Sequence, residues 1–233
     1  MKVNTLSCES CQTRKNSLFT HCKPDELSQL SNNKNCITYK KGQIIFHEGS
    51  KPFGVYCLNA GKVKLCKSNS EGKEQIVRLA KPGDFIGYRA FMADSIYSGS
   101  AVAMEESTVC FIPREEFEKL VGSNKKFSLE FMKQLSSALG LAEERLAKLA
   151  MKPVRERIAE ALVLLNSTYN PDHNPAFEMM ISREDLASLV GTAKETAIRF
   201  LSELKEENII ATHGSAIKVI DMDKLIKISN LYD

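Results

Sequence analysis

The segment SREDLASLVGTAKETAIRFLSELK (residues 182–205) predicts two short helices joined by a tight turn. Ser182 is a residue type that commonly caps a helix N-terminus, and Gly191 can take the left-handed conformation that ends a helix. Thr192 begins the second helix. The apolar residues of the first helix fall on one face, at Leu186, Leu189 and Val190. Two helices joined by so short a turn are typical of a helix-turn-helix.

The second helix has two different faces when its residues are placed at about 100° intervals. The apolar face consists of Ala193, Ala197, Phe200, Leu201 and Leu204. The opposite face carries Glu195, Ile198, Arg199 and Ser202, with Lys194 and Thr196 at its flanks. A helix that lies in the major groove of DNA needs such a polar face, on which Arg199 suits guanine and Glu195 suits the cytosine amino group. We therefore expect this face to contact bases.

The same residues also have ordinary structural interpretations. Thr192 and Glu195 have the spacing of a capping box, and Glu195 and Arg199 that of an ion pair along one helix. Residues near the predicted helix N-termini and in the hairpin that follows suit phosphate contacts or a solvated surface equally well. They are Ser182, Thr192, Lys194, Thr196 and Lys218.

Upstream, residues 37–113 predict short strands. Apolar and polar residues alternate in KVKLC (62–66) and EQIVRLA (74–80). Glycines recur between the apolar stretches, at Gly42, Gly49, Gly61, Gly72, Gly83 and Gly87. This pattern is typical of a small antiparallel barrel or roll.

After Pro113 the pattern becomes helical, with apolar residues alternately three and four apart. These residues are Met132, Leu135, Leu139, Ala142, Leu146 and Leu149. Such a seam predicts a helix that packs against a second copy, although a long helix packed on its own roll would show it too. Pro153 places the domain boundary directly after this helix.

Composition places the chain among globular proteins, with 43% hydrophobic and 26% charged residues in a total of 233. Neither a signal peptide nor an apolar stretch of about 20 residues is evident, so we expect a cytoplasmic protein. The net charge is +3, but residues 151–233 hold 10 Lys or Arg against 13 Asp or Glu. Overall charge therefore does not predict DNA binding, which depends on the local pattern of residues 182–205.

The stretch KETAIRFLSELKEENII (residues 194–210) resembles the recognition helix of the Crp/Fnr family of transcription regulators. The resemblance implies an α+β fold: a cyclic-nucleotide-binding-like antiparallel β-roll, a long dimerisation helix and a C-terminal winged helix-turn-helix. It divides the chain into an N-terminal cysteine segment (1–22), the roll (23–124), the dimerisation helix (125–152) and the DNA-binding domain (153–233). It further implies a homodimer on an inverted-repeat operator, with Glu195 and Arg199 reading bases, and RNA polymerase as a partner.

Members that bind cyclic AMP have a glutamate for the ribose and an arginine for the phosphate in their binding cassette. The matching positions here are Gly87, Tyr88 and Arg89, then Tyr97 and Ser98. Tyr88 replaces the glutamate, and Tyr97 or Ser98 replaces the arginine. A buried phosphate without its cation is poorly compensated, so we expect an effector other than cyclic AMP at this pocket.

Seven cysteines without an export signal suggest free thiols or metal ligands. Cys8, Cys11, Cys22 and Cys110 resemble the iron–sulfur ligands of oxygen-sensing Fnr proteins, although ten residues separate Cys11 from Cys22. Zinc held by Cys8, Cys11, His21 and Cys22 is an alternative. Cys110 could also be a buried apolar residue, as we expect for Cys57 and Cys66, while Cys36 is undecided.

Two rival functions are an enzyme on a roll scaffold and a nucleotide-binding module that contacts another protein. A cupin enzyme needs clustered histidines, whereas His21, His47, His173 and His213 are isolated in the sequence. No Ser-His-Asp or P-loop pattern stands out either. The polar face of residues 194–202 argues against the protein-binding module. We therefore expect a DNA-binding regulator without catalytic activity.

Overall fold

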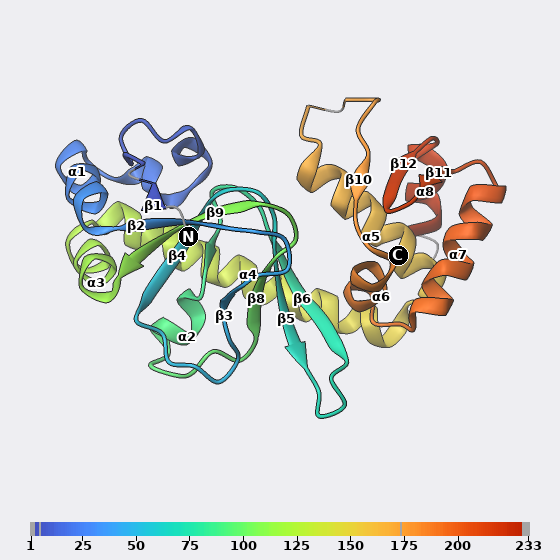
Figure 1. Ribbon diagram of the computed structural model, residues 1–233, viewed down its shortest axis with the longest axis horizontal. Coiled ribbons are helices and arrows are strands. Elements are labelled where there is room, and N and C mark those ends of the chain that lie inside the picture. The colour runs from blue at the N-terminus through green and yellow to red at the C-terminus, as the bar shows by residue number, and fades with distance from the viewer. Residues whose placement is uncertain (1–2, 5, 173, 230–233) are drawn as a thin grey trace. The chain divides into compact units, whose positions relative to one another are not determined.

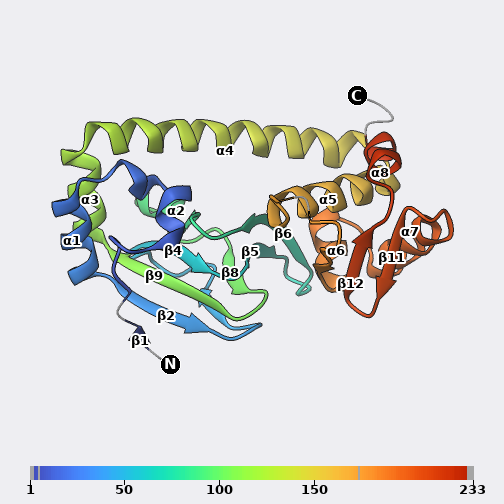
Figure 2. The same cartoon turned by 90° about the horizontal axis from the view of Figure 1, so that it is seen from above.

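The computed structural model describes residues 3–4, 6–172 and 174–229, and the chain divides into two compact units (Figure 1). They are Met1–Leu139 and Gly140–Asp233. Helix α4 (Lys125–Met151) begins in the first unit and ends in the second as one uninterrupted helix (Figure 2). The division between the units thus falls within the predicted dimerisation segment, and the four-part division of the chain stays a prediction.

The first unit is built on two antiparallel sheets, with strand orders β1-β2-β9-β4-β7 and β3-β8-β5-β6. The strands are β1 (Val3–Asn4), β2 (Asn35–Tyr39), β3 (Ile44–Phe46), β4 (Gly54–Ala60), β5 (Val63–Ser68), β6 (Glu74–Ala80), β7 (Phe85–Ile86), β8 (Ser100–Ala103) and β9 (Ser107–Pro113). The predicted antiparallel roll is therefore confirmed. In the β5–β6 hairpin, Val63 pairs with Ala80 and Cys66 with Ile76, and all four side chains are buried.

Helices and an aromatic cluster close one side of the first unit. The helical segments are two 3₁₀ turns (Gln12–Asn16 and Leu18–His21), α1 (Pro24–Asn33), α2 (Tyr88–Met92) and α3 (Arg114–Ser123), followed by the first part of α4. Phe117 of α3 lies at the centre of the cluster, 5.9 Å from Phe127 and 5.4 Å from Phe131 between ring centroids. Edge-to-face contacts of this kind favour one arrangement of the rings. They fix the start of α4 on the roll.

The second unit is a small helical domain with a three-stranded sheet of order β10-β12-β11. Its elements are α5 (Val154–Tyr169), β10 (Met179–Met180), α6 (Arg183–Val190), α7 (Lys194–Glu206), β11 (Ile210–His213), β12 (Ala216–Val219) and α8 (Met222–Ser229). Pro153 caps α5, whose stripe of Ile158, Leu162 and Leu165 is buried. Helix α8 adds Leu225 to this core.

Candidate nucleic-acid interface

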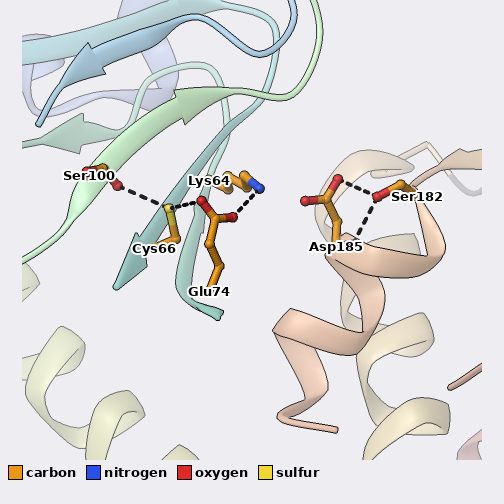
Figure 3. Close-up of polar contacts among 6 residues, drawn as sticks. All are labelled: Lys64, Cys66, Glu74, Ser100, Ser182 and Asp185. Carbon is orange, nitrogen blue, oxygen red and sulfur yellow. Dashed lines mark hydrogen bonds and ion pairs between the residues drawn. The ribbon is translucent and has the colours of Figure 1, made fainter. Parts of the chain in front are cut away.

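The helix-turn-helix forms as predicted, because a capping residue defines each end of α6. The Ser182 hydroxyl oxygen accepts a hydrogen bond of 2.9 Å from the Asp185 backbone N–H and donates one of 2.7 Å to its carboxylate (Figure 3). Gly191 ends the helix with φ at 72°, in the left-handed region where a side chain would be strained. Only residues 191–193 separate α6 from α7, so the turn holds the two helices in a fixed arrangement.

Helix α7 buries a narrower face than the sequence predicts. Ala197, Leu201 and Leu204 are buried, whereas Phe200 is half-buried. Ala193 is exposed and serves as the N-cap, with no side-chain cap hydrogen bond. The helix therefore begins at Lys194, two residues later than the expected Thr192, and the interpretation of Thr192 and Glu195 as a capping box is wrong.

The polar face of α7 is open to solvent along its length. Its exposed residues are Lys194, Glu195, Ile198, Arg199 and Ser202, while Thr192 and Thr196 are half-buried. Arg199 pairs with Glu203, at 4.0 Å between Nε and Oε1, and not with Glu195. Its guanidinium carbon also lies 4.6 Å from the centroid of the Phe200 ring. The Arg199 side chain is nonetheless 65% exposed, so this long ion pair is weak and leaves the guanidinium accessible.

A two-stranded wing follows α7. Strands β11 and β12 pair from Ile210 with Val219 to His213 with Ala216, and Gly214 stands in the turn. Arg183, the first residue of α6, donates a hydrogen bond of 2.9 Å from Nη2 to the Gly214 carbonyl oxygen. This bond ties the tip of the wing to the start of the helix-turn-helix. Lys218, the proposed phosphate contact of the wing, is half-buried.

Arg183 is a positioning residue that the sequence pattern did not predict. The sequence feature that could have indicated this role is a basic side chain directly after the Ser182 cap. The carbonyl that Arg183 contacts, however, lies 31 residues further along the chain. Only the folded hairpin brings the two together.

The residues of the predicted effector pocket differ in their exposure to solvent. Tyr88 is buried, and its hydroxyl oxygen accepts a hydrogen bond of 3.2 Å from Arg78 Nη1, whereas Arg89 and Ser98 are exposed. The Tyr97 ring stacks on Phe46 at 3.9 Å between centroids and packs against Gly87. Burial raises the pKa of Tyr97, which therefore stays a neutral phenol. Aromatic side chains thus fill the roll at the positions where the cassette was expected.

The cysteines are arranged differently from the predicted ligand set. Cys36 and Cys110 form a disulfide, although the sequence suggested free thiols or ligands. Cys8, Cys11, Cys57 and Cys110 line one cavity, which Cys22 does not line. Cys57 and Cys66 are buried, as expected.

A metal or iron–sulfur centre does not fit this arrangement. The Cys110 sulfur is bonded to Cys36, and within residues 3–4, 6–172 and 174–229 no three His, Cys, Asp or Glu side chains are placed to hold a metal ion. Neither the iron–sulfur set nor the zinc set with His21 is assembled. His173 lies outside the described residues.

The seam of α4 is largely exposed. Met132, Leu139, Ala142 and Leu146 are exposed, whereas Leu135 packs partly on the aromatic cluster and Leu149 is half-buried. Leu139 is 62% exposed. An apolar row of this kind is unusual on the surface of a monomeric protein. None of the described helices is long and apolar enough to cross a membrane.

Comparisons with known proteins agree with this architecture. Residues 36–124 match the family model of the cyclic nucleotide-binding domain, and residues 156–228 match that of the Crp-like helix-turn-helix domain. The regulatory protein HlyX of Actinobacillus pleuropneumoniae is 28% identical over 226 residues, which cover 95% of this chain and 93% of HlyX. The cAMP-activated global transcriptional regulator CRP of Salmonella typhimurium is 29% identical over 185 residues, covering 78% and 87% of the two chains.

A solved structure extends the agreement to the fold. FixK2 from Bradyrhizobium japonicum superimposes with a TM-score of 0.74 at 25% sequence identity, covering 84% of this chain and 96% of FixK2. The roll, the long helix and the winged helix-turn-helix occur here in the same chain, and this family consists of regulators rather than enzymes. The chain belongs to the Crp/Fnr family of transcription regulators.

Proposed function

We propose that the chain binds a specific DNA operator through α7, which enters the major groove. The observation that supports this most directly is the exposed polar face of α7, opposite the buried Ala197, Leu201 and Leu204. The short turn at Gly191 holds this face outward. A recognition helix needs both features, since its side chains must reach base edges while its back is anchored.

In this proposal Arg199 donates to guanine and Glu195 accepts from a cytosine amino group. Glu195 makes no ion pair with any other described residue, so it keeps its acceptor atoms for a base. Ile198 and Ser202 lie beside them, although the Ser202 hydroxyl donates to the Ile198 carbonyl at 3.1 Å. Lys194, Thr192 and Thr196 are placed near the helix N-terminus, where phosphate contacts are favoured.

Ser182 has a different role from the other predicted phosphate contacts. Its hydroxyl already accepts from and donates to Asp185, so the negative carboxylate lies where a phosphate would have to approach. We therefore assign Ser182 mainly to capping α6.

The active species in this proposal is a homodimer on an inverted-repeat operator. The exposed Met132, Leu139 and Leu146 of α4 have the spacing of one seam, which a second copy of α4 would cover. A two-fold axis between the copies repeats α7 once in each half-site. RNA polymerase is the further partner that we propose. Because the proposed ligand is DNA, we also propose that the protein acts in the cytoplasm.

The N-terminal unit would control DNA binding through an effector or a redox signal. We propose that this signal is not cyclic AMP. Arg89 is exposed, and Tyr88 and Tyr97 are buried at positions where the cassette would supply its anchoring groups. A cyclic phosphate would lack an arginine at the cassette position, and the half-buried Arg78 nearby already contacts Tyr88 and Asp84.

Selection of bound DNA from a random pool would identify the operator. Arg199→Ala should then lose about 1–3 kcal/mol of discrimination between operator and scrambled DNA for each half-site. Lys205→Ala is a matched control, because Lys205 is an exposed cation in the last turn of the same helix. Unchanged discrimination in a folded Arg199→Ala protein would refute base reading by this residue.

A further inference from the structure

Three cysteines stand side by side on adjacent strands of the five-stranded sheet. Cys110 of β9 is in register with Cys36 of β2 on one side and with Cys57 of β4 on the other. Residues directly opposite each other in antiparallel strands project from the same face. Cys36 and Cys110 are joined by a disulfide with their Cα atoms 4.0 Å apart. The disulfide and a third sulfur thus share one face of the sheet.

A second pair of thiols borders the same face. Cys8 and Cys11 belong to the N-terminal segment and line one cavity together with Cys57, Cys110 and Lys34. Two cysteines separated by two residues are a spacing that closes a disulfide readily in thiol–disulfide oxidoreductases. A disulfide and a dithiol therefore meet in one cavity.

Lys34 makes the two sulfurs of the disulfide unequal. Its ammonium nitrogen lies 3.2 Å from Cys36 Sγ and 3.7 Å from Cys110 Sγ. A nearby cation stabilises a thiolate, and the better stabilised thiolate is the faster leaving group. Cys36 is therefore the leaving sulfur, and Cys110, which faces the cavity, is the sulfur that is attacked.

Cys11 is the best placed nucleophile of the three cavity thiols. Burial raises the pKa of Cys57 and of Cys8, so both remain protonated at neutral pH. Cys11 is only half-buried, and the Asn59 amide nitrogen lies 3.2 Å from its Sγ as a donor.

We propose that the Cys8–Cys11 dithiol exchanges with the Cys36–Cys110 disulfide inside this cavity. The Cys11 thiolate attacks Cys110 Sγ, the bond between Cys110 and Cys36 breaks, and Cys36 leaves as a thiolate beside Lys34. Cys8 then attacks Cys11 Sγ, which forms the Cys8–Cys11 disulfide and releases Cys110. The two protons lost by Cys8 and Cys11 pass to Cys36 and Cys110, so the exchange consumes no external oxidant or reductant.

The exchange transfers a covalent link from the sheet to the N-terminal segment. Before it, the disulfide ties β2 to β9 across 74 residues of sequence. After it, β2 and β9 are held together without a covalent bond, by their backbone hydrogen bonds, the 3.2 Å hydrogen bond between the Thr38 and Thr108 hydroxyls, and side-chain packing. The exchange gives the N-terminal unit a chemical input of its own, separate from DNA recognition.

The test uses the full-length protein, quenched with N-ethylmaleimide in acid and mapped by mass spectrometry of non-reduced peptides. Cys8→Ser removes the resolving thiol, so the mixed disulfide Cys11–Cys110 should accumulate. Cys11→Ser should contain Cys36–Cys110 alone. Cys66→Ala is the control, because Cys66 hydrogen-bonds to Glu74 and Ser100 on the other sheet (Figure 3). This substitution should leave the mixture of disulfide-linked peptides the same as in the unsubstituted protein.

Two results would overturn the proposal. One is Cys8→Ser protein that contains Cys36–Cys110 but no Cys11–Cys110 at any time of incubation, and the other is a Cys57–Cys110 link in the native protein. Circular dichroism verifies the fold of each variant, and Cys8→Ala replaces Cys8→Ser if the latter does not fold. Operator binding measured on the same samples is a separate readout, so failure of the exchange and failure of DNA recognition are distinguishable.

Discussion

The Arg145 guanidinium donates a hydrogen bond of 2.7 Å to the backbone carbonyl oxygen of Leu189. Arg145 lies on α4, and Leu189 lies in the last turn of α6, within the same unit. Carbonyls in the last turn of a helix lack a partner within the helix and carry a partial negative charge. The bond therefore ties the end of the long helix directly to the helix-turn-helix.

Replacing Arg145 by leucine should lower the free energy of unfolding by about 1.5–3 kcal/mol, the range for hydrogen bonds to charged groups. The substitution leaves the Leu189 carbonyl without this donor and keeps much of the apolar stem. Urea unfolding followed by circular dichroism measures the change. Arg89→Leu is the control at an exposed arginine, and equal loss in both variants would contradict the assignment.

Ser182→Ala should destabilise the second unit by about 0.5–2 kcal/mol, because the first turn of α6 loses its cap. Ser182→Gly separates capping from phosphate contact. A glycine cap costs only a few tenths of a kcal/mol, whereas both substitutions remove the hydroxyl that would bind a phosphate. Thermal unfolding and operator affinity are measured for each. A phosphate role would reveal itself as equal affinity losses in the alanine and glycine variants.

Leu139→Glu should convert the dimer to a monomer, because it places a charge in the apolar seam of α4. The matched control is Leu141→Glu, since Leu141 is as exposed as Leu139, at 65% against 62%, but projects from the other side of the helix. Sedimentation equilibrium distinguishes the two species. Dimers of unchanged affinity in Leu139→Glu would assign this face of α4 to another partner.

Cys22 should react slowly with iodoacetamide in the native protein. Burial, and secondarily the charges of Glu26 and Cys8, raise its pKa from 9.0 to about 12. The native state therefore keeps the thiol protonated where the unfolded chain ionises it. This contribution to stability is complete below about pH 9 and is lost as the pH rises toward about 12.

Alkylation rates of Cys22 in native protein and in urea, measured by peptide mass spectrometry across this pH range, check the shift. The rate should still rise with pH in the native protein after it has levelled in the unfolded one. Coincident profiles would contradict the raised pKa.

Residues close together in sequence carried most of the correct predictions. Ser182 and Gly191 mark the two ends of α6 at the expected positions. This was predictable because helix capping and left-handed turns depend on the residue itself and its nearest neighbours. Interactions along α7 were harder to predict. Arg199 has Glu195 and Glu203 at equal spacing on either side, and only the side-chain conformation selects Glu203.

The sequence by itself determined the order of the domains, the heptad seam of α4 and the outward residues of α7, since periodicity along one chain defines them. Tertiary structure alone decided that Arg183 holds Gly214, that Arg145 holds Leu189 and that Cys36 is bonded to Cys110. Each of these pairs joins elements that are distant in sequence. Their contact depends on strand register and helix packing, which are properties of the whole fold and which no local pattern encodes.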